Sequence, residues 1–274
     1  MDRDKQKKEL REYYEKSAVE RGDMDGYQYL HRAPGLLLEK IAEFANNLHG
    51  KILDIGCGDG RISLTLSARD RLMIGVELAR RRVERAREKF GDQQRKGFFI
   101  QGDGEELPFR DEVLDGIVLT EVLEHVPDDG KVLRELTRVL KPGGRVILSI
   151  PSISWRKFIL IKKNKVAVYD STEHLREYSY FDLSSFDPRY ITFSELDRSF
   201  SAFGLKIIKS RGVGYDLFKL LYFIPLLERL DFILYSRTVN KLCALIPIIN
   251  RLPVYRIYLL EKEEESTLKI VKGC

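Results

Sequence analysis

The sequence predicts an α/β fold built on a doubly wound, mostly parallel seven-stranded sheet, with a helical insert before the last strand. Strand-like and helix-like segments alternate between residues 51 and 150, as parallel strands with helical crossovers require. The runs Ile117–Thr120 and Val146–Ile150 are almost continuously apolar, which is typical of strands buried on both faces. A Lys-Pro-Gly-Gly stretch at 141–144 is a strong helix stop before the second of these runs.

The individual elements follow from local patterns. Apolar runs predict strands at 51–55, 72–76, 98–101, 116–120, 145–150, 205–209 and 254–260. Apolar side chains at helical spacing predict helices at 35–48, from Ala79 to Phe90, and at 129–140, with a short helix after Gly60. A capping box from Thr192 to Glu195 predicts a helix through Phe203, and Gly204 follows its end. Residues 1–12 are mostly charged and are expected to be frayed or helical at the surface.

These patterns divide the chain into three parts. Residues 1–34 form an N-terminal helical segment, 35–211 together with 251–262 form the main domain, and 212–250 form a hydrophobic helical insert or lid. The 274 residues carry 47 basic and 42 acidic side chains, a mild net charge of +5 that identifies no partner. Three cysteines without paired spacing indicate a reducing, cytoplasmic setting. No run of 18 apolar residues occurs, so we expect no membrane span, although peripheral membrane contact stays open.

A glycine-rich turn follows the first predicted strand. Gly56, Gly58 and Gly60 let the backbone adopt positive φ and pass close to a ligand. Their G-x-G-x-G spacing departs from the G-x-G-x-x-G pattern of dinucleotide-binding proteins. Asp54, at the end of the strand, suits a cationic or ammonium-bearing ligand.

Two further carboxylates end neighbouring strands. Glu77 ends the second predicted strand, where a carboxylate can accept both hydroxyl groups of a ribose. Asp103 follows the third strand and is placed to accept a hydrogen bond from an exocyclic amine such as that of adenine. Three adjacent strand ends therefore offer a glycine cradle, a ribose acceptor and an amine acceptor.

With these motifs in this order, the sequence resembles the class I S-adenosylmethionine-dependent methyltransferases. The matching segments are LDIGCGDG (53–60), GVEL (75–78), GDGEELPF (102–109), LDGIVLTEVLEHVPD (114–128) and LKPGGRVILSIP (140–151). The resemblance implies S-adenosylmethionine as cofactor and S-adenosylhomocysteine (SAH) as product. It places the three glycines at the methionine part, Glu77 on the ribose and Asp103 on the adenine.

The resemblance implies further cofactor contacts. Gly104 and Glu105 would lie beside the adenine ring, and Thr120 would approach the methionine end. Cys57 and Leu78 belong to the same motifs, although Cys57 also fits a small buried residue in a crowded loop. Arg32 lies in a segment that resembles quinone-biosynthesis methyltransferases, in which an arginine meets the cofactor's carboxylate; a plain surface arginine is the alternative.

Two histidines are candidates for the chemistry. His125 follows the fourth strand and has three interpretations: a general base, a metal ligand together with Glu121 and Glu124, or a structural loop residue. His174 lies in a segment that resembles the roof of the substrate pocket in related enzymes; an incidental residue of a solvated linker is the alternative. No metal is assigned.

Two unusual surfaces suggest different substrates. Residues 80–96 contain eight basic and three acidic residues, which suits either a nucleic-acid footprint or, more simply, a solvated helix face. The apolar stretch 217–249 suggests a lid over an apolar or lipid-like acceptor, extra core, or a dimer interface; the oligomeric state is not determined. We therefore predict methylation, by O-methylation, of a small apolar or lipid-like acceptor. The alternatives are an RNA or protein methyltransferase, with nucleic acid less favoured, or a non-catalytic cofactor-binding module.

Overall fold

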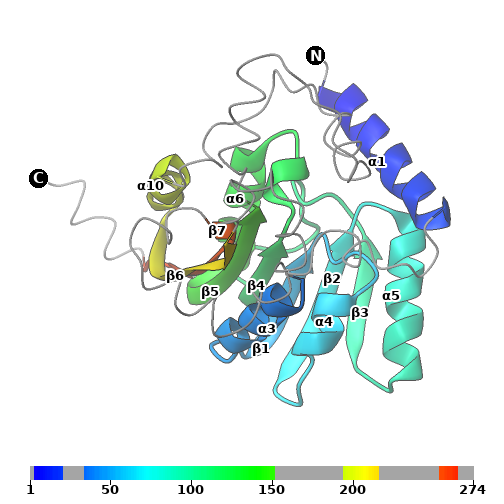
Figure 1. Ribbon diagram of the computed structural model, residues 1–274, viewed down its shortest axis with the longest axis horizontal. Helices are drawn as coiled ribbons and strands as arrows, with labels where there is room; N and C mark the ends of the chain where they lie inside the picture. The colour runs from blue at the N-terminus through cyan, green and yellow to red at the C-terminus, as the bar shows by residue number, and fades with distance from the viewer. Residues whose placement is uncertain (1–2, 21–33, 152–193, 216–252, 265–274) are drawn as a thin grey trace, which may run out of the picture.

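The computed structural model describes residues 3–20, 34–151, 194–215 and 253–264. Figure 1 shows one central sheet with helices on both sides. The strands are β1 (Gly50–Ile55), β2 (Arg71–Glu77), β3 (Gly97–Gln101), β4 (Leu114–Thr120), β5 (Leu140–Pro151), β6 (Leu205–Tyr215) and β7 (Pro253–Lys262). The helices are α1 (Arg3–Glu20), α3 (Pro34–Ala45), α4 (Arg61–Leu66), α5 (Arg80–Asp92), the short 3₁₀ helix η1 (Leu123–His125), α6 (Asp129–Val139) and α10 (Ser194–Ala202).

The sheet has the predicted doubly wound topology. Its strand order is β3-β2-β1-β4-β5-β7-β6. Strands β1 to β5 pair in parallel, and β7 runs antiparallel to both β5 and β6. The chain moves outward from β1 in both directions, to β2 and β3 on one side and to β4 and β5 on the other. A ligand crevice is expected outside the carboxyl ends of the strands at such a switch point.

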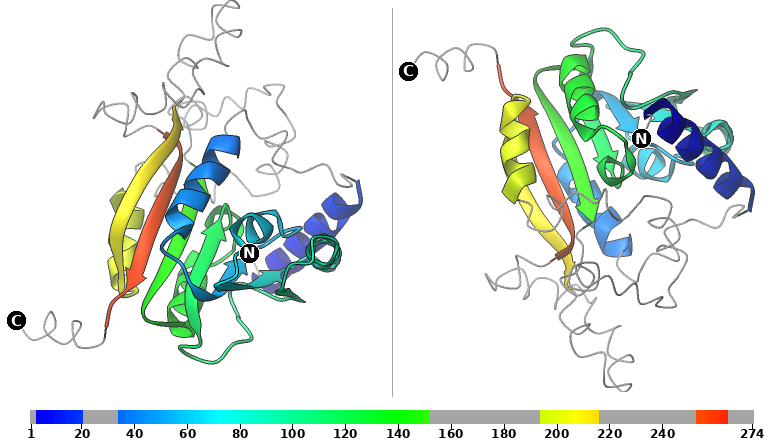
Figure 2. Two further views of the ribbon diagram at one scale, coloured as in Figure 1. Left: turned by 90° about the horizontal axis from the view of Figure 1, so that it is seen from below. Right: turned by 90° about the horizontal axis from the view of Figure 1, so that it is seen from above.

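Side chains of the strands alternate between two apolar cores, one on each face of the sheet. Helices α3, α4 and α5 cover one face, where Ile41, Ile62 and Phe90 pack against strand residues such as Ile52. Helices α6 and α10 cover the other face, where Leu136 belongs to the second cluster. The two views of Figure 2 show α3 and α10 on opposite sides of the sheet. This burial on both faces explains why the central strands are apolar runs rather than alternating patterns.

The predicted elements are present, with differences at their ends. All seven predicted strands form, and each is longer than predicted. The 141–144 stretch does end α6, but it belongs to strand β5, with a register shift between Leu114 and Gly116 of the partner strand. Gly204 has a φ of 68° after α10, as expected for the residue that ends a helix. Residues 212–215 of the predicted insert belong to β6, and the rest, up to residue 250, lie outside the described residues.

The N-terminal segment, predicted as helical over residues 1–34, contains a helix that extends beyond the charged residues 1–12. Helix α1 covers 18 residues and lies against α5 (Figures 1 and 2). Among the described helices, none is both long enough and apolar enough to cross a membrane.

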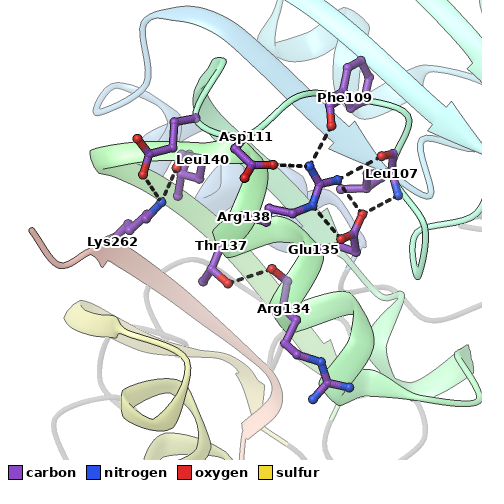
Figure 3. Close-up of polar contacts among 10 residues, drawn as sticks. Leu107, Phe109, Asp111, Arg134, Glu135, Thr137, Arg138, Leu140 and Lys262 are labelled. Carbon is purple, nitrogen blue, oxygen red and sulfur yellow. Dashed lines mark hydrogen bonds and ion pairs between the residues drawn. The ribbon is translucent and has the colours of Figure 1, made fainter. Parts of the chain in front are cut away.

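A guanidinium from α6 holds the loop that follows β3. Arg138 donates to the carbonyl oxygens of Leu107 and Phe109 and pairs with Asp111 and Glu135 (Figure 3). The Glu135 carboxylate in turn accepts the Leu107 N–H at 2.7 Å. Such forked, charge-assisted hydrogen bonds fix both position and orientation. The 102–109 loop, which follows the carboxyl end of β3, is therefore held in place by α6.

Candidate functional site

The glycine loop after β1 is bonded directly to the end of β2. The Glu77 carboxylate accepts the Gly58 N–H at 3.0 Å through Oε2 and the Ala79 N–H at 2.9 Å through Oε1. Glu77 is only 5% exposed, so these bonds also satisfy a buried charge. Besides its predicted contact with a ribose, Glu77 therefore shapes the glycine loop. Each carboxylate oxygen retains a lone pair for a ligand hydroxyl.

The three glycines of the loop meet different surroundings. All have positive φ: 68° at Gly56, 53° at Gly58 and 79° at Gly60. A Cβ on Gly56 would lie 2.5 Å from the Val122 side chain, so the loop after β4 packs closely on this turn. A Cβ on Gly58 would meet nothing within 4 Å. Gly58 therefore presents bare backbone to open space, and this is the feature expected where a ligand approaches the main chain.

Asp54 lies inside the protein rather than at the surface of the loop. It is 1% exposed, and its Oδ2 accepts the Ser63 hydroxyl at 2.5 Å, which ties β1 to α4. Burial, together with the nearby Glu77 charge, raises the pKa of Asp54 to about 7. A role of Asp54 in binding the cofactor remains a prediction, and the contact with Ser63 gives it a structural role as well.

This raised pKa predicts a pH dependence of stability. Because the folded pKa is about 7 and the ordinary value is 3.8, folding favours the protonated Asp54, and stability falls as the pH rises from about 4 to about 7. We expect Asp54→Asn to remove a slope of about 1 kcal/mol per pH unit. Urea unfolding of both proteins at pH 5 and pH 7 measures this difference. Equal slopes in the two proteins would contradict the assignment.

Cys57 is a buried structural residue of the loop. Its thiol is free, and burial raises its pKa well above the ordinary range, so the thiol stays protonated. Its Sγ lies 2.7 Å from where a Cβ on Gly75 would be, which accounts for the glycine in β2. This environment agrees with the interpretation of Cys57 as a small residue in a crowded loop.

A cavity of about 420 Å³ opens at the ends of β2 and β3. Its lining includes Leu78, Gln101, Gly102 and Asp103 from the sheet side. Leu78 and Asp103 both line this cavity, and the placement of adenine at Asp103 stays a prediction. The other lining residues, Lys7, Lys8 and Arg11, come from α1, to which the sequence analysis assigned no role.

The loop after β3 places its acidic residues in two environments. Asp103 is partly exposed at the cavity, and its Oδ1 accepts the Glu105 N–H at 2.8 Å. Glu105 is buried, and its carboxylate accepts the Asp128 N–H at 3.1 Å, which links the loop to the start of α6. Gly104 lies close to Ile55, because a Cβ there would be 3.0 Å from that side chain. Of these residues, Asp103 is the one that lines the cavity.

The loop after β4 carries the predicted transfer residues. Thr120 ends β4 and is 8% exposed, and Glu121 follows with a φ of 54°, a conformation that non-glycine residues rarely adopt. The Glu121 Oε1 accepts the Ser149 hydroxyl at 2.6 Å. Burial raises the pKa values of Glu121 and Glu124, and the charge of Glu121 adds to the effect at Glu124.

His125 lies at the outer end of this loop. Its Nε2 is 3.7 Å from Glu124 Oε1, and its ring meets the edge of Tyr14 from α1 at a centroid distance of 6.4 Å. Among the residues that the structure describes, no group of three or more His, Cys, Asp or Glu side chains is arranged to hold a metal ion. Arg32 and His174 lie outside the described residues.

The basic helix α5 uses several of its charges within the protein. Arg87 donates to the Phe99 carbonyl oxygen, Lys89 pairs with Asp59, and Arg80 pairs with Glu84. These contacts favour the interpretation of a solvated helix face over that of a nucleic-acid footprint.

The residues at the strand ends fit an adenosyl cofactor. Glu77 has acceptor capacity for a diol, Gly58 has an open backbone, and Asp103 lies at a cavity of suitable size for a nucleoside base. Val122 brings the loop that carries Thr120 and His125 against Gly56. The site therefore runs from β3 across β2 and β1 to β4.

Comparisons with known proteins identify the same stretch of chain. Residues 53–148 match a family model described as a methyltransferase domain. The chain is 37% identical over 101 residues to a 27-O-demethylrifamycin SV methyltransferase from Amycolatopsis mediterranei (strain S699), covering 36% of this chain and 37% of that protein. It is 32% identical over 130 residues to a ubiquinone biosynthesis O-methyltransferase from Aliivibrio fischeri (strain ATCC 700601 / ES114), covering 46% of this chain and 56% of that protein.

A solved structure shows the same fold. A magnesium protoporphyrin IX methyltransferase from Synechocystis PCC 6803 with bound SAH superposes with a TM-score of 0.60 at 14% identity, covering 94% of this chain and 100% of that one. The matches to the two curated relatives span about half or less of their lengths. Together with the ordered motifs at the strand ends, these matches show that the chain contains a class I S-adenosylmethionine-dependent methyltransferase domain.

Proposed function

We propose that the whole chain is a methyltransferase that transfers the methyl group of S-adenosylmethionine to a small, apolar or lipid-like acceptor, by O-methylation. The observation that carries the proposal is the Glu77 carboxylate bonded to the N–H of Gly58, beside the open backbone of that glycine. This arrangement joins a diol acceptor and a bare main-chain surface at adjacent strand ends. The relatives named for demethylrifamycin and for ubiquinone biosynthesis support the O-methylation of an organic molecule.

Each part of the proposed cofactor is matched by residues of the site. Glu77 would bind the ribose, Leu78 and Asp103 the adenine, and the loop from Gly56 to Gly60 the methionine portion. Gly104, Glu105 and Thr120 would complete the walls. When bound, the cofactor supplies a methyl group activated by a positively charged sulfur. Positioning alone then provides much of the rate acceleration, of order 7–11 kcal/mol for well-oriented reactants.

The chain's own contribution to chemistry is proton transfer at His125. A hydroxyl acceptor must lose its proton during methylation, and a ring nitrogen of His125 would accept it. The Glu124 carboxyl lies 3.7 Å from Nε2 and is the nearest acidic group to the ring in the described residues. Tyr14 contacts the same ring and limits its movement.

We expect His125→Ala to lower kcat by roughly 10²- to 10⁴-fold and to remove the acidic limb of the pH–rate profile, because the general base is lost. Binding of SAH should stay unchanged, which calorimetry measures. His49→Ala is the matched control, since His49 is exposed, pairs with Asp70 and lies at the other end of β1. Full turnover in the His125 variant would remove this residue as the base.

The acceptor class is tested by transfer of a radiolabelled methyl group into a fractionated cell extract. We expect label in the organic-soluble fraction, as small molecule or lipid. Label in RNA or protein would contradict the proposed acceptor and identify the chain as an RNA or protein methyltransferase. SAH binding without transfer to any fraction would favour a non-catalytic module.

A further inference from the structure

Helix α1 forms one wall of the cavity at the ends of β2 and β3. Lys7, Lys8 and Arg11 line the cavity from α1, opposite Leu78 and Asp103. In Figure 1 the helix lies across the end of α5 that follows β2. The cavity assigned to the cofactor base is therefore bounded by a segment far away in sequence from every motif of the domain.

One side chain of α1 is bound to the acidic residues of this cavity. The Lys7 ammonium lies 2.7 Å from Asp103 Oδ2 and 2.9 Å from Glu105 Oε2. Burial lowers the pKa of Lys7, but the hydrogen bonds and charges of the two carboxylates outweigh this effect and raise it. Lys7 is therefore a fully charged partner at the pH of any ordinary experiment.

The contact involves the same carboxylate that a ligand amine needs. Asp103 Oδ1 accepts the Glu105 N–H and Oδ2 accepts a hydrogen bond from Lys7, so each oxygen retains one lone pair. Because Lys7 also lines the cavity, its ammonium occupies space that an adenine base at Asp103 would need.

The second half of α1 is attached elsewhere. The Glu15 carboxylate accepts the N–H groups of Arg80 (2.6 Å) and Arg81 (3.4 Å) in the first turn of α5. The Arg82 guanidinium lies 4.8 Å above the Tyr14 ring. These contacts use free amide groups and the positive end of the helix dipole of α5, and none of them involves Asp103. Loss of the Lys7 contact would leave this attachment in place.

We propose that Lys7 is a latch on the cofactor cavity: the adenine amine and the Lys7 ammonium compete for Asp103, so that cofactor binding releases the first half of α1. The inference rests on the proposed cofactor site. It makes α1 a gate for cofactor exchange, with Lys7 as the residue that sets affinity. The apparent dissociation constant then rises in inverse proportion to the fraction of molecules with the latch open.

Removing the latch tests the proposal through binding alone. We expect Lys7→Met to bind SAH about two- to fivefold more tightly than the wild-type chain, the upper part of the range for losing a partly exposed ion pair. Lys5→Met is the matched control, because Lys5 is an exposed lysine of the same helix whose partner is Glu9. Calorimetry with SAH measures both. Unchanged or weaker binding by the Lys7 variant would overturn the latch.

Hydrogen exchange on the wild-type chain gives a second test that requires no variant. On saturation with SAH, we expect faster amide exchange in residues 4–11, while residues 13–19 keep their protection. Slower exchange in residues 4–11 would mean that Lys7 helps to hold the ligand and would overturn the proposal. Neither test needs a methyl acceptor. Failure to find a methyl acceptor therefore bears only on the proposed function. If the chain transfers methyl groups but SAH slows amide exchange in residues 4–11, the latch is refuted and the proposed function stands.

Discussion

Replacing Glu77 with alanine is expected to weaken SAH binding by at least about 100-fold. Two hydrogen bonds from a carboxylate to ribose hydroxyls would be lost, each contributing roughly 1.5–3 kcal/mol, and about 3 kcal/mol corresponds to a factor of roughly 100. The substitution also leaves the N–H groups of Gly58 and Ala79 without their acceptor, so the glycine loop loses its shape. Calorimetry with SAH measures the effect.

A fold control accompanies this measurement. Thermal unfolding of the Glu77 variant should show a cooperative transition at a lowered temperature, because the buried N–H of Ala79 and the part-buried N–H of Gly58 lose their acceptor. Glu88→Ala is the matched substitution, since Glu88 is an exposed carboxylate on α5, and it should leave the affinity unchanged. A folded Glu77→Ala chain that binds SAH as tightly as the wild type would show that this carboxylate does not contact the cofactor.

Replacing Gly58 with alanine is expected to reduce SAH affinity by roughly 10- to 100-fold with only a small loss of stability. The added methyl group meets no atom of the protein within 4 Å, so packing is not disturbed. The φ of 53° is strained for alanine, which costs about 1–2 kcal/mol. The methyl group would, however, stand where the ligand approaches the backbone, and overpacking of that kind costs about 1–3 kcal/mol.

Gly143→Ala separates strain from ligand contact. Gly143 has a φ of 72°, and a Cβ there also meets nothing within 4 Å, but it lies at the start of β5, away from the glycine loop. The two variants should lose similar stability in urea unfolding, and only Gly58→Ala should lose affinity. A similar affinity for SAH in both variants would mean that the open space at Gly58 is not used by the cofactor.

The sheet could be predicted from the sequence because strands buried on both faces appear as runs of apolar residues. The centres of β4 and β5 are apolar runs, IVL and VIL, and helix α6 between them carries one apolar stripe. The glycine loop was equally visible, since positive φ at three alternate positions demands glycine. Element ends were less accurate: β5 begins at Leu140, and the Pro-Gly-Gly stretch lies in the register shift between the Leu114–Leu140 and Gly116–Arg145 pairs.

Contacts between segments that are distant in sequence could not be predicted from such patterns. Lys7 meets Asp103 across 96 residues, and one lysine in a strongly charged helix is indistinguishable by pattern from its exposed neighbours. The sequence also placed Asp54 at a strand end without showing that it turns inward to Ser63. In both cases the strand order determines which side chains approach each other, while side-chain direction depends on packing that periodicity does not encode.

The central claim is that the ends of β1, β2 and β3 converge on one adenosyl ligand, and a crystal structure of the full chain with SAH tests it most directly. The account predicts the ribose hydroxyls on Glu77, the base beside Leu78 and Asp103, and the amino-acid portion along Gly56 to Gly60. SAH bound at saturation in a different place, with Glu77 and Gly58 both free of contact to it, would contradict the account.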